Sequence, residues 1–151
     1  MDGSSDPNAA RKAWLSVLSK APATDLANLW SKAGYDPAHE VLRAPEIGAV
    51  MVRGRAGAVG APFNLGEMTV TRCSIRLASG EVGHGYVQGR DKIHATQAAL
   101  ADALMQTADA KDVDASIIAP LRKAAERRCA TRAAKAAATK VDFFTMVRGE
   151  D

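Results

Sequence analysis

The sequence has few of the residues that build cysteine-rich, metal-binding or membrane-spanning proteins. Its 151 residues include 2 cysteines, Cys73 and Cys129, which are too few for a disulfide framework or a zinc cluster. No apolar run reaches the roughly 20 residues that cross a bilayer, and the N-terminus lacks the basic and apolar segments of a signal peptide. These absences predict a cytoplasmic protein, with no membrane contact, whose thiols are reduced and buried.

The motifs of common catalytic and cofactor sites are also missing. His39, His84 and His94 have no metal-ligand spacing to one another or to a cysteine. There is no nucleophile elbow, and Gly83 and Gly85 lie in a strand pattern, whereas a dinucleotide fingerprint opens a helix. We therefore predict no catalytic residue, no metal and no cofactor in this chain. Whether it belongs to an enzyme complex is a separate question.

Composition and hydrophobic periodicity predict one α+β domain. The chain is 47% hydrophobic and 25% charged, which suffices for a core of its own. We expect a disordered N-terminus over residues 1–8, the domain over residues 9–140, and an extended C-terminal docking tail over residues 141–151. The net charge of +3 is too small to indicate nucleic-acid binding by itself.

Two short helices are expected first. Asp6-Pro7 is a typical helix start, and the second helix ends at Gly34, where a left-handed residue is favoured. Trp14 and Trp30 lie on the apolar faces of these helices, which is more typical of a core than of ligand stacking.

An antiparallel meander of about four strands should follow. The strands are expected at His39 to Arg43, Ile47 to Arg53, Met68 to Ala78, and a last one ending at Gln88, with Pro45 separating the first two. The second is apolar on both faces, which predicts a central or doubly covered strand. The glycine-rich stretch from Gly54 to Pro62 suits a hairpin loop better than a phosphate cradle, because no Gly-Lys-Ser/Thr ending follows it; Arg53 and Arg55 leave anion binding open.

The chain turns from sheet to helix at Gly89. A helix from Asp91 to Thr107 is predicted, with Asp91 as its cap and a stripe formed by Ile93, Gln97, Leu100 and Leu104. Gly83 and Gly85 leave room for a helix, the favoured interpretation, or for a ligand. Gly89, Arg90 and Lys92 place cations beside free N–H groups, a candidate phosphate or acidic-residue contact, although Asp91 argues partly against an anion there.

The C-terminal part is basic and then apolar. A helix is expected to begin near Asp114, and from Lys123 onward it carries one acid, Glu126, among basic residues, namely Arg127, Arg128, Arg132, Lys135 and Lys140. A solvated face, an acidic partner and, least favoured, nucleic acid are the three interpretations. The apolar run Val141 to Val147 must join this domain's sheet or dock into another chain. Its candidate partner-interface residues are Phe143, Phe144, Met146 and Arg148.

Four stretches carry a resemblance to a known family. They are Ala44 to Gly48, Gly60 to Arg72, Tyr86 to Lys92 with His94-Ala95, and Val141 to Gly149. In this order and spacing they resemble the G subunit of the phosphonate carbon–phosphorus lyase system, from about Arg11 to Gly149. The resemblance is specific because it rests on four separate motifs.

The resemblance implies a small subunit of a bacterial cytoplasmic core complex that also contains H, I and J subunits. With the I and H subunits and an L component, such subunits support the displacement of adenine from ATP by an alkylphosphonate. The product is a ribose 1-phosphonate 5-triphosphate, which the radical J subunit later cleaves. The resemblance assigns the nucleosidase chemistry to the I subunit and no catalytic residue to the G subunit.

Two classes of function therefore remain in play. The favoured one is a structural and interaction subunit of a transferase complex in phosphonate catabolism. The alternative is a direct contribution to a shared active site, in which Arg90 or Lys92 holds a phosphate or phosphonate.

Overall fold

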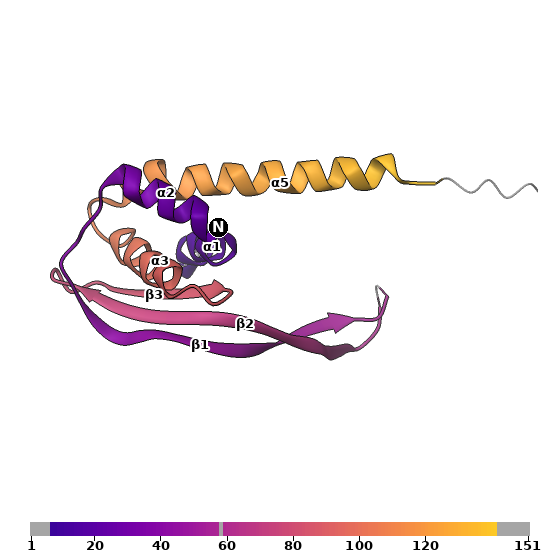
Figure 1. Cartoon of the computed structure of the whole chain (residues 1–151), viewed down its shortest axis with the longest axis horizontal. Helices are drawn as coiled ribbons and strands as arrows, with labels where there is room; N and C mark the ends of the chain where they lie inside the picture. Colours follow the sequence, from indigo (N-terminus) through magenta and orange to yellow (C-terminus); the bar gives the residue numbers. More distant parts are fainter. Residues whose placement is uncertain (1–6, 58, 142–151) are drawn as a thin grey trace, which may run out of the picture.

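The computed structural model describes residues 7–57 and 59–141 as an antiparallel sheet with helices packed on one face (Figure 1). The elements in chain order are α1 (Pro7–Lys20), α2 (Ala23–Ala33), β1 (His39–Arg55), β2 (Pro62–Leu77), β3 (Val82–Gln88), α3 (Lys92–Leu104), α4 (Ala110–Val113), a π-helical turn (Asp114–Ile118) and α5 (Ala119–Ala138). Among the described helices, none is long and apolar enough to cross a membrane. The predicted α+β class and antiparallel meander are confirmed.

The sheet has three strands because the segments expected as the first and second strands form one continuous strand, β1. Pro45 does not break β1; the pairing with β2 passes from Arg43 to Glu46 across an irregularity. Proline has no N–H to donate, so it is tolerated at a bulge or an edge. β1 is an edge strand, since the strand order is β1-β2-β3, and the bulge at Pro45 therefore disturbs only one ladder. Arg55 pairs with Pro62, which confirms the predicted hairpin.

The prediction that the second expected strand is central or covered on both sides is wrong. β2 takes the central place, and the helices pack chiefly against β2 and β3. Val41, Leu42 and Met51 of β1 are exposed as a result. The apolar pattern of this strand does not arise from burial within its own domain.

The packing of α3 on β3 depends on small residues. A Cβ built on Gly83 would overlap the carbonyl oxygen of Ala99, and one on Gly85 would overlap that of Ala95. Helix packing therefore accounts for both glycines, as favoured from the sequence. The predicted stripe is partly wrong, because Ile93 is 69% exposed and alanines make up most of the contact. A helix that lies this close to a sheet has no room for larger side chains.

The joint between β3 and α3 has the predicted chemistry. Gly89 has a positive φ of 96°, and its carbonyl accepts a hydrogen bond of 2.8 Å from Thr71 Oγ1. The Asp91 side chain accepts from the His94 backbone N–H at 3.0 Å, which caps α3. Trp14 and Trp30 pack against the core, as predicted.

Two parts of the chain extend beyond the packed region. In Figure 1, α5 and the hairpin end of β1 and β2 both run past α1 and α3 on the same side of the molecule. Within α5, only Leu121 is buried. Cys73 is buried as predicted, but Cys129 is exposed, because α5 has left the core at that point. Phe143, Phe144, Met146 and Arg148 lie outside the described residues, as do residues 1–6 of the expected N-terminus.

Candidate functional site

A buried carboxylate joins three elements of the fold. Asp102 of α3 accepts hydrogen bonds from Arg11 Nε at 3.1 Å and Arg11 Nη2 at 2.7 Å. It also accepts from Trp14 Nε1 at 2.8 Å and from the His84 backbone N–H at 2.9 Å. These donors compensate its negative charge, so Asp102 fixes α1 against β3 and α3. Sequence patterns do not predict this role of Asp102; the available signal is a single acid in an alanine-rich helix.

The same cluster protects the outer edge of β3. Odd-numbered residues of β3 pair with β2, as the bonds of Gly89 and Glu81 at the two ends show, so even-numbered residues direct their backbone groups outward. The outward carbonyl of Val82 accepts from Arg11 at 3.1 Å and from Gln106 at 2.9 Å. Side chains thus satisfy two edge groups of β3, the Val82 carbonyl and the His84 N–H, that would otherwise be open to another strand.

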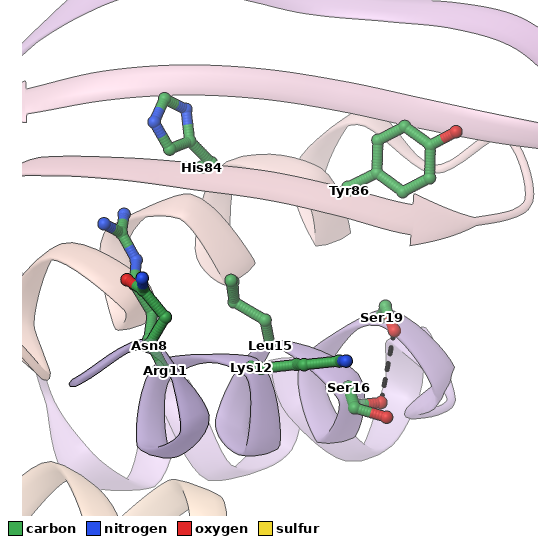
Figure 2. A pocket seen from close by; sticks show the side chains of 8 residues that line it. All are labelled: Asn8, Arg11, Lys12, Leu15, Ser16, Ser19, His84 and Tyr86. Carbon is green, nitrogen blue, oxygen red and sulfur yellow. Dashed lines mark hydrogen bonds between the residues drawn. The ribbon is translucent and has the colours of Figure 1, made fainter. Parts of the chain in front are cut away.

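A groove of about 510 Å³ lies between α1 and β3 (Figure 2). Its walls are formed by Asn8, Arg11, Lys12, Leu15, Ser16 and Ser19 of α1 and by His84 and Tyr86 of β3. Figure 2 shows Leu15 directed from α1 toward the strand. Arg11 is held by Asp102, and the His84 ring lies 2.9 Å from Ser74 Oγ. The groove therefore offers an apolar and aromatic surface in which most polar groups already have partners.

The predicted phosphate contact at the start of α3 lies outside this groove. Arg90 and Lys92 are exposed and make no ion pair within the described part of the chain. Lys92 and the bulge of β1, residues 43–47, line a hollow of about 490 Å³. Two stretches that carry the family resemblance therefore meet here, one at the bulge and one at the start of α3. The Asp91 carboxylate occupies the cap position of this helix.

A third hollow, of about 570 Å³, lies along α5. We define the α5 basic stripe as Arg127, Arg128, Arg132 and Lys135, which line this hollow together with Ala124 and Thr131. Arg128 lies 3.3 Å from Asp25 of α2, and both side chains are exposed. Arg127, Arg132 and Lys135 make no ion pair with any residue in the described ranges.

Two of the groups with shifted pKa values, His94 and Cys73, are buried structural residues. Burial lowers the pKa of His94, whose Nε2 lies 3.2 Å from the Leu18 carbonyl oxygen. Burial also raises the pKa of the Cys73 thiol. Over residues 7–57 and 59–141, no group of three or more His, Cys, Asp or Glu side chains is placed to hold a metal ion.

Comparison with known proteins identifies the family. The model of the family described as phosphonate metabolism protein PhnG matches residues 9–149. The chain belongs to the PhnG family. One PhnG relative is the alpha-D-ribose 1-methylphosphonate 5-triphosphate synthase subunit PhnG of Rhizobium meliloti (strain 1021). It is 46% identical over 146 residues, which cover 95% of this chain and 92% of the relative. The resemblance drawn from the four sequence motifs is thereby confirmed.

Proposed function

We propose that this PhnG family member is a non-catalytic subunit of a ribose 1-methylphosphonate 5-triphosphate synthase. The observation that carries the proposal is the 46% identity to a subunit of that name along 95% of the chain. The H, I and J subunits of the cytoplasmic carbon–phosphorus lyase core complex would be its partners. ATP and an alkylphosphonate would be the substrates of the assembled complex, which replaces adenine at ribose C1 with the phosphonate.

The uncovered apolar surface supports a role in assembly. Met51, Phe63 and Leu65 lie near the hairpin end of β1 and β2, and each is 45–66% exposed. Apolar surface left in water forgoes about 25 cal/mol per Å² relative to burial, and clustered exposed apolar residues mark interaction sites. This hairpin end is therefore suited to contact another subunit.

The polar groups support a non-catalytic role. Asp102, the buried acid, accepts four hydrogen bonds and is inaccessible to a substrate. His94 is buried and bonded to a backbone carbonyl. A general base must reach the proton that it removes, and neither group meets this requirement.

Co-expression tests this proposal. The chain is produced with and without the H, I and J subunits of the same organism, and the complexes are sized by light scattering. We expect the chain to join the complex, and we expect the isolated chain to release no adenine from ATP and phosphonate. Adenine release by the isolated chain, lost on a single substitution within it, would contradict the non-catalytic role.

A direct contact of Arg90 or Lys92 with substrate phosphate is the second candidate. It is favoured by the exposure of both cations; the other charged residues of the hollow that Lys92 lines, Arg43 and Glu46, form an ion pair 3.5 Å apart. A charge-assisted hydrogen bond contributes roughly 1.5–3 kcal/mol, so Arg90→Ala in the assembled complex should raise the KM for ATP or phosphonate about tenfold or more. Lys111→Ala, which removes an exposed cation of α4, is the control. Unchanged KM with weaker assembly would assign Arg90 to an interface.

A further inference from the structure

We infer that the α5 basic stripe is a docking surface for an acidic face of a partner subunit. The inference rests on the proposed function and specifies the chemistry of one contact in the complex. It depends on the position of the stripe on α5, on its uncompensated charge, and on the intrinsic stability of the projecting helix.

The stripe continues the face by which α5 packs on its own domain. Leu121 is the buried residue of α5, and Arg128, Arg132 and Lys135 follow it at spacings that return to the same face of a helix. Every residue from Ala125 to Lys140 is exposed. The same face is therefore apolar where the domain covers it and basic where α5 projects beyond the domain.

The charge on this segment is concentrated and largely uncompensated. Residues 125–140 contain five basic residues and one acid, Glu126, although the whole chain carries a net charge of only +3. Arg128 has its exposed partner Asp25, whereas Arg127, Arg132 and Lys135 have no ion pair within the described residues. An acidic surface is the chemical complement of such a stripe.

Two residues of the stripe disfavour the helix that carries them. Its many alanines have the highest helix propensity, which allows the projecting part to remain helical without tertiary contacts. Arg128 and Arg132, however, are like charges at positions i and i+4, and such a pair destabilises a helix by a few tenths of a kcal/mol. An acidic partner removes this repulsion.

A protein partner fits the stripe better than nucleic acid does. The stripe has no aromatic residue for base stacking. Nucleic-acid affinity at physiological salt depends largely on the number of neutralised phosphates, and three uncompensated cations can neutralise only a few.

A charge-reversal pair with a matched control tests the inference. The full-length variant Arg132→Glu/Lys135→Glu is compared with Lys123→Glu/Lys111→Glu, which changes the net charge equally away from the stripe. Affinity for the complex of the H, I and J subunits is measured by surface plasmon resonance at about 50, 150 and 500 mM salt. Because exposed pairs contribute up to about 1 kcal/mol each, the stripe variant, which loses two pairs, should bind about tenfold more weakly at low salt than the control. The neutral variant Arg132→Gln/Lys135→Gln should show a smaller loss.

The outcomes separate the inference from the proposed function. If the wild-type chain binds the subunits but the stripe variant loses no more affinity than the control, the inference is wrong and the proposed function stands. If the wild-type chain does not bind the subunits at all, both are wrong. Stripe-dependent binding to a 20-nucleotide single strand, tighter than to the subunits at about 150 mM salt, would also overturn the inference in favour of nucleic acid. Circular dichroism verifies that each variant retains its helix content.

Discussion

The packed half of the molecule and its projecting half use opposite kinds of residue. Where α3 meets β3, glycines and alanines bring backbones into close contact. At the hairpin end of β1 and β2, large apolar residues such as Phe63 and Leu65 are exposed. Along the outer part of α5, every side chain is exposed and the charge is mostly basic.

The difference indicates which surfaces serve the domain and which serve other chains. The packed half is stabilised by the close approach of α3 to β3 and by the hydrogen bonds to Asp102. Few other residues would therefore fit at each of its positions. The projecting half contributes little to the stability of its own domain. Changes in the packed half should therefore unfold the chain, and changes in the projecting half should weaken only assembly.

The largest effect is expected for Asp102→Asn. The change removes the charge that Arg11 and Trp14 satisfy and leaves the partly buried guanidinium without its partner. Breaking a buried pair in this way typically lowers the free energy of unfolding by about 3–5 kcal/mol. Urea denaturation measures this loss in the free energy of unfolding. The control variant Glu40→Gln, which breaks the exposed pair with Arg76, should lose less than about 1 kcal/mol. Equal losses for the two variants would show that Asp102 is not a structural clamp.

Gly83→Ala should lower the free energy of unfolding by about 3 kcal/mol. The added methyl group overlaps the Ala99 carbonyl, and a backbone atom within a packed helix cannot move aside easily. The matched control is Gly48→Ala in β1, where a Cβ would have no neighbour within 4 Å among the described residues. Thermal unfolding of both variants measures the effect, and a neutral result for Gly83→Ala would mean that α3 can shift away from the sheet.

Truncation after Lys140 should leave the domain folded and weaken assembly. The predicted tail residues Phe143 and Phe144 lie beyond α5, whose outer part makes no contribution to the core. An aromatic anchor at an interface costs on the order of 2 kcal/mol or more when it is removed. Circular dichroism and pull-down with the H, I and J subunits test both parts, and Phe143→Ala/Phe144→Ala in the full chain is the companion variant. An unfolded truncated chain would instead make the tail a strand of its own domain.

The smallest effect concerns His94 and pH. Burial lowers its pKa in the folded chain, whereas the unfolded chain takes up the proton near the ordinary value of about 6.5. The unfolded state therefore binds more protons just below pH 6.5, and the free energy of unfolding falls as the pH decreases through this range. His94→Gln should reduce this acid sensitivity, as measured by urea denaturation between pH 7 and pH 5. His39→Gln, which removes an exposed histidine, should not.

The local patterns were sufficient for the elements and their caps. The pattern from Met68 to Ala78 predicted a strand that, apart from Ala78, lies within β2, and Asp91 and Gly89 predicted the start of α3 and the joint before it. Local propensity and hydrogen bonding decide these features, so neighbouring residues contain the information. The four motifs likewise identified the family without the structure.

Long-range contacts decided what the patterns could not. The apolar run of β1 predicts burial, but only the sheet order shows that β1 is an edge strand left uncovered. The network of Asp102 joins Arg11, 91 positions away in the sequence, and no spacing rule connects them. Gln97 and Ile93 follow helical periodicity. The glycines of β3, however, allow α3 to lie so close to the sheet that alanines form the contact instead. Periodicity shows which side chains lie on the same face of an element. The distance between two packed backbones determines whether large or small side chains can form the contact between them.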